Sequence, residues 1–240
     1  MSSELPPLAE AGNLCDVSAQ VMNRTAYLPY REPTVADIGS FDAKRGSTEM
    51  PDPLLTSHRL SRFYLVGAGD FVYAIGKLLA LDEPMVVSPA VLGRSTAEYA
   101  SRCRYISDAA DGPDIRLSKL ANLCNEGFQD LGIGKPGADP DLVALAKGFK
   151  DWRSRQQLPK VSFPNYSALV DALSPSMGKR VYGGLSGIAH ASAISLSATF
   201  LSAQIEGLES FRTVSFGLSG CLTLLDPFGL YLIRGAIANR

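Results

Sequence analysis

Three polar side chains near the C-terminal end of the chain could exchange protons. Tyr182, Ser186 and His190 follow one another at four-residue steps, and each such step on an α-helix turns the side chain by only about 40°. A phenol, a hydroxyl and an imidazole on one face can form a hydrogen-bond ladder, or can position a general acid or base whose ordinary pKa is about 6.5. A packed core in which Tyr and Ser bond neighbouring backbone would show the same row.

A second polar row carries charges at the same spacing. Arg94, Glu98 and Arg102 lie four residues apart in the otherwise apolar segment LGRSTAEYASRCRYI. Buried charges must be paired, so an ion pair between Arg94 and Glu98 is the structural interpretation of this row. The functional interpretation is an anion clamp, because guanidinium groups donate in pairs to carboxylate or phosphate. Arg116, two residues after Asp114, could join either arrangement.

The two rows together suggest a polar pocket for a small anionic molecule, with His190 available for proton transfer. A metabolic or biosynthetic enzyme and a ligand sensor both fit this hypothesis. The candidate catalytic residues are Tyr182, Ser186 and His190, and the candidate ligand-binding residues are Arg94, Glu98, Arg102 and Arg116.

Neither a metal nor a cofactor is implied by the remaining motifs. The four cysteines are widely spaced, without a C-x-x-C pair or a histidine at zinc-ligand spacing. The GAGD sequence at Gly67–Asp70 lies inside a helical pattern and follows no strand, so it is not expected to bind a nucleotide.

Helical periodicity positions both rows, and strand signals are rare. Apolar residues recur at three- and four-residue steps, and Ser-Pro, Asp-Pro and glycine signals mark helix ends. We expect helices over about Pro53–Leu81, Ser88–Ser107, from the ADGPD break to Gly132, Asp139–Trp152, Tyr166–Leu173 and from about Ser176 onward, then an apolar pair broken at Asp226-Pro227.

The sequence therefore predicts an all-α fold. Short connections favour an up-and-down helical bundle over residues 54–240, with additional apolar helices at its C-terminal end. Residues 1–53 hold six prolines and are expected to form an irregular arm with one short helix near Cys15–Ala26.

The composition of the chain indicates which binding partners and which cellular compartment are expected. The net charge of -1 supplies no overall positive field for nucleic acid or anionic lipid. The N-terminal sequence MSSELPPLAEAG lacks the basic and apolar regions of a secretory signal. With free thiols, this favours a reducing compartment and a cytoplasmic protein.

Two uncharged stretches are long enough to be considered as membrane spans. Val181–Ile205 has no charged residue, but it holds six Ser or Thr residues and many Ala and Gly, which suits a buried helix better than a lipid-facing one. In Thr213–Ile233 only Asp226 is charged and Pro227 interrupts the run. A membrane span is not the favoured interpretation of either stretch.

The polar rows resemble a known group of helical proteins. An R-x-x-x-E helix, a D-x-x-R helix start and a Y-x-x-x-S-x-x-x-H helix are similar to uncharacterised bacterial all-α proteins related to the HEPN-like bundles. Here these elements are Arg94 with Glu98, Asp114 with Arg116 at a spacing one residue shorter, and the Tyr182 row. The resemblance covers roughly residues 54–233 and implies a helical bundle that is often a dimer.

The resemblance also implies a second function, but the spacing of residues in this sequence argues against it. Nuclease members of that group use an R-x4-6-H pattern to act on RNA, whereas the nearest arginine before His190 is Arg180, ten residues upstream. An RNA-acting toxin or defence protein is therefore an alternative that is not favoured. A non-catalytic scaffold that pairs through its C-terminal helices is a third hypothesis.

Two basic segments have simpler interpretations. His58, Arg59 and Arg62 are typical of a solvated helix start. The segment Lys147–Lys160 mixes basic residues with the only Trp and could bind nucleic acid, but a solvated face with Phe149 and Trp152 turned inward is the favoured interpretation.

Overall fold

The structure is a computed structural model, and the part of the chain that it describes is helical. No strand occurs among the described residues, which confirms the predicted all-α class. The described residues are 8–28, 34–81, 85, 87–173, 175, 178–194 and 197. The expected apolar pair around Asp226-Pro227 and the whole uncharged stretch Thr213–Ile233 lie outside these ranges.

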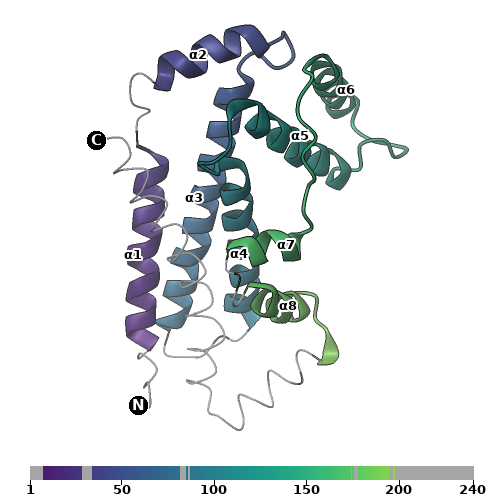
Figure 1. Ribbon diagram of the computed structural model, residues 1–240. Coiled ribbons are helices and arrows are strands. Elements are labelled where there is room, and N and C mark those ends of the chain that lie inside the picture. The colour runs from purple at the N-terminus through teal and green to yellow at the C-terminus, as the bar shows by residue number, and fades with distance from the viewer. Residues whose placement is uncertain are drawn as a thin grey trace. The chain divides into compact units, whose positions relative to one another are not determined.

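The described residues contain eight helices, joined by turns and extended segments (Figure 1). Their bounds are α1 Leu8–Ala26, α2 Thr34–Arg45, α3 Pro53–Leu79, α4 Val87–Ser107, α5 Pro113–Asp130, α6 Pro140–Arg155, α7 Tyr166–Leu173 and α8 Gly178–Ala189. From α3 to α7 the predicted helices are confirmed, with ends within three residues of those expected.

Local capping explains why these ends could be predicted. At the start of α6, the Asp139 carboxylate accepts hydrogen bonds from the amides of Asp141 and Leu142, and Pro140 occupies the first turn. After α5, Gly132 adopts a φ of 70°, and the amides of Gly132 and Ile133 donate to the carbonyls of Gln129 and Phe128. That pattern is a Schellman motif, which needs a left-handed residue and so favours glycine.

The N-terminal 53 residues hold more helix than the sequence predicted. The expected short helix is the second half of α1, which already begins at Leu8, and α2 was not expected. Turn-forming residues in the sequence of α2 obscure the weak apolar periodicity that would have predicted this helix. The buried Asp42 explains one role of this helix, because its carboxylate accepts hydrogen bonds from the amides of Leu54 and Leu55 at 2.7 and 3.1 Å and so caps the first turn of α3.

The chain divides into two compact units, and each is built from separated segments. Unit 1 takes its described residues from Met1–Leu28, Phe63–Cys103 and Pro164–Arg240, and unit 2 takes them from Pro29–Arg62 and Arg104–Phe163. Helices α3 and α4 each contribute residues to both units.

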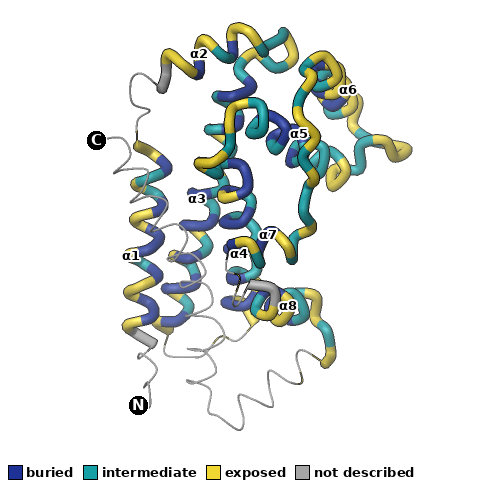
Figure 2. Tube along the Cα trace, viewed as in Figure 1, coloured by how far each residue is buried: buried dark blue, intermediate teal, exposed yellow. Residues whose placement is uncertain are grey.

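The core of unit 1 forms where α1 packs against the second half of α3 (Figure 1). Buried and exposed positions alternate along α1, as Figure 2 shows, because one face of the helix meets the core. A Cβ atom added at Gly76 would lie 3.0 Å from the Gly12 carbonyl oxygen, and one at Gly69 would lie 3.3 Å from Met22 Cβ. The order of these contacts shows that the two helices are antiparallel and in close contact.

Helix α4 and helices α7 and α8 complete unit 1. Ala97 of α4, Val170 of α7 and Tyr182 of α8 form one buried cluster, against which Tyr166 packs. Helices α7 and α8 also pack against each other. The glycines of the GAGD sequence lie inside α3, and Gly67 leaves room for the Tyr99 ring, which a Cβ there would meet.

The core of unit 2 centres on Trp152 of α6. The indole ring is fully buried, and its Nε1 donates a hydrogen bond of 2.9 Å to the Arg45 carbonyl at the end of α2. Phe149 lies between Trp152 and Phe128. Its ring centroid is 5.4 Å from that of Trp152 and 5.7 Å from that of Phe128. Aromatic burial of this kind supplies large apolar areas to a small core.

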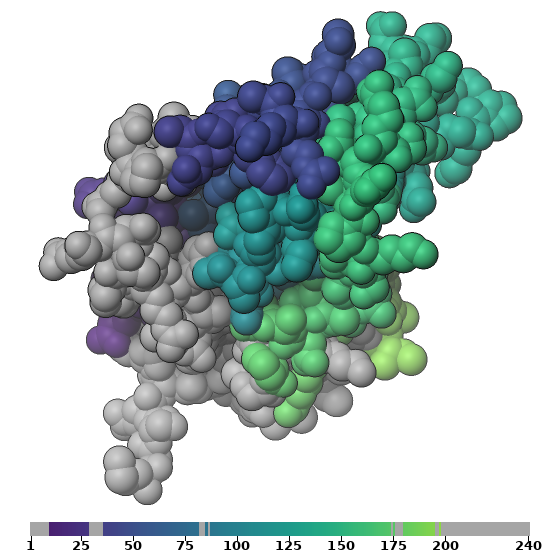
Figure 3. All heavy atoms as spheres, turned by 45° about the horizontal axis from the view of Figure 1, so that its top comes forward, coloured from purple at the N-terminus to yellow at the C-terminus, as the bar shows by residue number. Residues whose placement is uncertain are grey.

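An extended segment follows α6 and lies beside α5. The Asn122 amide donates to the Val161 carbonyl at 2.9 Å, and the Ser118 hydroxyl donates to the Pro159 carbonyl at 2.8 Å. Figure 3 shows this segment on the surface of the molecule. Its backbone is thus held by side chains of α5 rather than by a strand ladder.

No helix among the described residues has both the length and the apolar character needed to span a membrane. Within Val181–Ile205, α8 ends at Ala189, and much of the remaining stretch lies outside the described residues.

Candidate functional site

The first row predicted from the sequence lies on α4 and is an ion pair. Arg94 Nη2 lies 3.1 Å from Glu98 Oε1, and the two side chains are 25% and 18% exposed. The four-residue spacing places both on one face of the helix. Partial burial strengthens this pair relative to an exposed one, because less solvent screens the charges.

Tyr182 of α8 joins this pair from the second row. Its hydroxyl donates a hydrogen bond of 2.8 Å to Glu98 Oε1. The guanidinium carbon of Arg94 lies 6.0 Å from the centre of the Tyr182 ring. The ring itself is buried, with 7% exposed. The structure therefore brings Arg94, Glu98 and Tyr182 together, although Tyr182 follows Glu98 by 84 residues.

The environment sets the protonation state of this group. Burial, followed by the hydrogen bond to Glu98, raises the pKa of the Tyr182 hydroxyl above its ordinary value. Burial works against the charge of Arg94, but its contacts with Tyr182 and Glu98 raise the net pKa of the guanidinium. At neutral pH Tyr182 is thus a neutral hydrogen-bond donor and Arg94 is a cation. Tyr182 cannot act as a general base there.

Arg102 occupies the next turn of α4 and meets α7. Its guanidinium donates a hydrogen bond to the Tyr166 hydroxyl and lies 4.7 Å above the centre of the Tyr166 ring. The sequence contained Tyr166 only as a helix start, and no local spacing connects it with Arg102. Two arginines of α4 are therefore each paired with a tyrosine of a following helix, a feature we name the arginine–tyrosine site: Arg94, Glu98, Arg102, Tyr166 and Tyr182.

The arginine–tyrosine site holds a buried donor that the described part of the chain does not use. The Nε atom of Arg94 is buried, and it has no hydrogen-bond acceptor among the described residues. A buried N–H group without an acceptor is costly, since the free energy of its lost hydration is not recovered. Such a group is a reason to look for a ligand.

The other two members of the Tyr182 row lie further along α8. Ser186 is half-buried, and its carbonyl accepts a hydrogen bond of 3.0 Å from the His190 amide. Helix α8 ends at Ala189, so His190 is exposed at its C-terminal end. The next residue, Ala191, adopts a left-handed φ of 52°. Among the described residues, the His190 side chain makes no hydrogen bond that would hold it beside Arg94.

Arg116 belongs to unit 2, and its contacts are with backbone. Its Nε and Nη2 atoms donate to the carbonyls of Asp111 and Asp108 at 3.3 and 3.2 Å. These bonds hold the turn before α5, which explains Arg116 without a ligand.

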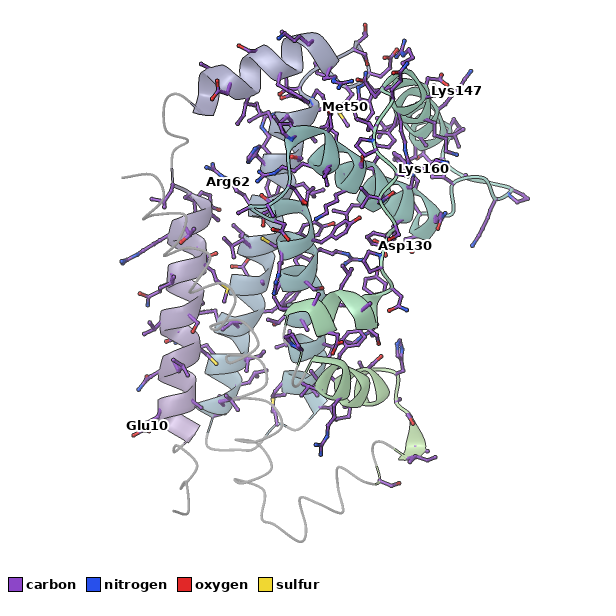
Figure 4. The ribbon with its side chains drawn as sticks, viewed as in Figure 1. Glu10, Met50, Arg62, Asp130, Lys147 and Lys160 are labelled. Carbon is purple, nitrogen blue, oxygen red and sulfur yellow. The ribbon has the colours of Figure 1, made fainter. Side chains whose placement is uncertain are left out.

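The basic segment Lys147–Lys160 has the arrangement that the sequence favoured. Lys147 and Lys160, labelled in Figure 4, are exposed, whereas Phe149 and Trp152 are buried. Aromatic rings that lie in the core cannot stack on bases.

His58 differs from the solvated residue that its sequence context suggested. It is half-buried, and burial together with the charges of Arg116 and Arg62 lowers its pKa to about 4. The imidazole is thus neutral at pH 7, because a proton there would be desolvated and repelled by two cations.

Metal and thiol chemistry find little support in the described part of the chain. No group of three or more His, Cys, Asp or Glu side chains there could hold a metal ion. Cys15, Cys103 and Cys124 form no disulfide within the described residues, and burial raises the pKa of Cys124 to about 11. A thiol with that pKa is not a nucleophile near neutral pH.

The chain matches no family model, and no curated protein or solved structure is significantly similar to it. The resemblance to the HEPN-like bundles accordingly stays a prediction from the sequence.

Proposed function

We propose that this protein binds a small anionic molecule, a carboxylate or a phosphate, at the arginine–tyrosine site. The observation that carries the proposal is the buried Arg94 Nε, a donor with no acceptor among the described residues. The Arg94 side chain is 25% exposed, so a small rotation that brings its Nε–H group to the surface would let a bound anion accept this hydrogen bond.

The charges of the site favour an anion over other ligands. Arg94 and Arg102 contribute two positive charges, and Glu98 contributes one negative charge. Glu98 Oε1 is already shared between Arg94 Nη2 and the Tyr182 hydroxyl. The site therefore keeps an excess of positive charge and donors over acceptors, which is the balance that carboxylates and phosphates require.

The aromatic partners add rigidity to the binding groups. Each guanidinium lies against a tyrosine ring, and the rings belong to helices that pack on a common apolar cluster. Guanidinium groups held in this way lose little conformational entropy when a ligand binds. Proton transfer by His190 remains a separate hypothesis, because that side chain is exposed beyond the end of α8.

The proposal can be tested on the Arg94 Nε–H group directly. In a ¹H–¹⁵N spectrum of arginine side chains, the Arg94 signal is identified by its loss in Arg94→Lys. Titration with inorganic phosphate and with succinate should shift that signal. The Arg94→Lys variant keeps the charge but lacks the planar donor pair, so the affinity for the bound anion should fall roughly tenfold or more.

Arg180→Gln is the matched control. Arg180 is an exposed cation of α8, two residues before Tyr182, and its removal changes the net charge near the site without touching Arg94. Its affinity should stay within about twofold of the wild type because exposed charges are screened. If neither anion moved the Arg94 signal, or if Arg94→Lys bound as tightly as Arg180→Gln, the anion site would be rejected.

A further inference from the structure

A groove on unit 1 lies between α1 and α3, on helices other than those of the arginine–tyrosine site. Its volume is about 340 Å³, which falls within the range of small-molecule pockets. Residues of α1 and α3 line it, namely Ala19, Gln20, Asn23, Arg24, Asp70 and Tyr73.

The packing of the two helices explains the floor of the groove. Gly69 of α3 has no side chain, and a Cβ there would come within 3.1 Å of Asn23 Oδ1 and 3.3 Å of Met22 Cβ. The helix backbones are therefore close together at this level, with the buried Ala19 beside them. Longer polar side chains on either side form the walls.

An ion pair links α1 and α3 beside Tyr73, at one end of the groove. Lys77 Nζ donates a hydrogen bond of 2.7 Å to Asp16 Oδ2, linking α3 to α1. The same ammonium lies 4.7 Å from the centre of the Tyr73 ring and so fixes one wall of the groove. At this end, opposite charges of the two helices are matched with each other.

At the other end, opposite charges are present but not paired. Arg24 of α1 and Asp70 of α3 both line the groove, and neither forms an ion pair within the described residues. Both side chains are exposed, so solvent and solutes reach them. A cation on one wall and an anion on the other leave space for a molecule that carries both charges.

A buried polar atom gives an independent sign of a ligand. Asn23 Oδ1 is buried and has no hydrogen-bond partner among the described residues. Exchanging the oxygen and nitrogen of the amide would leave an unused donor in the same place, so the unsatisfied group does not depend on the assignment. Asn23 also lines the groove, where a bound molecule could supply its partner.

We propose that this groove binds a small zwitterion of the free amino acid class. The α-carboxylate pairs with the Arg24 guanidinium and the α-ammonium pairs with the Asp70 carboxylate. When the Asn23 amide rotates towards the groove, its Oδ1 accepts a further N–H of the ammonium group, and the Tyr73 ring packs against the ligand side chain. Each polar group of such a ligand then has a partner of opposite character.

The first experiment uses the purified full chain and the common L-amino acids as probes. Saturation-transfer NMR identifies a binder, which is then compared with its C-terminal amide and its N-acetyl derivative. The amide lacks the carboxylate and the acetyl derivative lacks the ammonium group. Because the groove needs both charges, each derivative should bind roughly tenfold more weakly or worse than the free amino acid.

The second experiment changes the protein. Arg24→Gln and Asp70→Asn each remove one charge at an exposed position, and each should weaken the amino acid roughly tenfold or more while the helical circular dichroism is unchanged. Asp130→Asn, which changes an exposed acid at the end of α5, is the matched control and should bind the amino acid as the wild type does.

These results separate the groove from the proposed anion site. The proposal is overturned if no common amino acid binds, or if both single-charge derivatives bind as well as the free amino acid. It is also overturned if a bound amino acid tolerates Arg24→Gln and Asp70→Asn. A failure of Arg94→Lys to alter phosphate or succinate binding would reject the anion site alone.

Discussion

The two compact units use charged side chains differently. In unit 2, Arg45 pairs with Asp114 at 2.8 Å, and Arg116 donates to the carbonyls of Asp108 and Asp111. In unit 1, the buried Nε of Arg94 has no acceptor among the described residues, and neither Arg24 nor Asp70 has an ion-pair partner there.

The difference shows which property marks a candidate binding site. Both units contain arginines beside carboxylates, so residue type alone does not distinguish them. In unit 2 the donors of these residues are directed to the protein itself and hold turns and helix ends. In unit 1 some hydrogen-bonding capacity is left over, and a buried group without a partner is a place where an ordered water or a ligand is expected to bind. We therefore expect changes in unit 2 to affect stability and changes in unit 1 to affect binding.

The largest expected effect is in unit 2, at Trp152. Trp152→Ala should lower the free energy of unfolding by about 3–5 kcal/mol, because a fully buried indole is replaced by a cavity and the Arg45 carbonyl keeps only the hydrogen bond from Gln156 Nε2. Urea denaturation followed by far-ultraviolet circular dichroism measures the loss, since this variant has no tryptophan fluorescence.

Leu145→Ala, on the exposed side of the same helix, is the control. Leu145 is 55% exposed and should cost less than about 1 kcal/mol. If Trp152→Ala were as stable as Leu145→Ala, Trp152 would not be the centre of the core of unit 2.

The helices of this fold could largely be predicted from sequence, because their ends depend on local chemistry. Asp139 and Pro140 start α6 by capping, and Gly132 ends α5 in a left-handed conformation. Helix α2 was not predicted because its own sequence shows no clear apolar periodicity. Its buried residue Asp42 is held by hydrogen bonds from the amides of α3, which the sequence of α2 does not encode.

The candidate sites could be predicted only in part. The spacing of Arg94 and Glu98 predicted their ion pair, and Tyr182 was already recognised as the start of a second polar row. The hydrogen bond that joins the two rows depends on how α8 packs on α4, and no local spacing encodes it. The same is true of Arg24 and Asp70, which line one groove only because α1 and α3 approach at Gly69.

A smaller effect in unit 2 should appear on acidification. The pKa of His58 is lowered from 6.5 to about 4 in the folded protein, so its proton binds more strongly to the unfolded chain. The stability due to neutral His58 is present above pH 6.5 and is lost as the pH falls towards 4. Allowing for partial solvent screening, this loss amounts to about 1–2 kcal/mol.

The measurement is the free energy of unfolding between pH 7 and pH 4 for two matched variants. His58→Gln should show a shallower decline than the wild type, whereas His190→Gln, which changes the exposed histidine, should keep the wild-type slope. Equal slopes for the two variants would mean that His58 titrates as an exposed histidine does.

The smallest expected effect tests unit 1. Tyr182→Phe removes the hydroxyl that donates to Glu98 Oε1, but Arg94 remains paired with the same oxygen, so no buried charge loses its last partner. The free energy of unfolding should fall by about 1 kcal/mol, measured by urea denaturation with far-ultraviolet circular dichroism. Tyr27→Phe, at a tyrosine that is 76% exposed, should have no measurable effect. A loss as large as that of Trp152→Ala would mean that the Tyr182 hydroxyl stabilises unit 1 as strongly as the indole stabilises unit 2, and the contrast between the two units would fail.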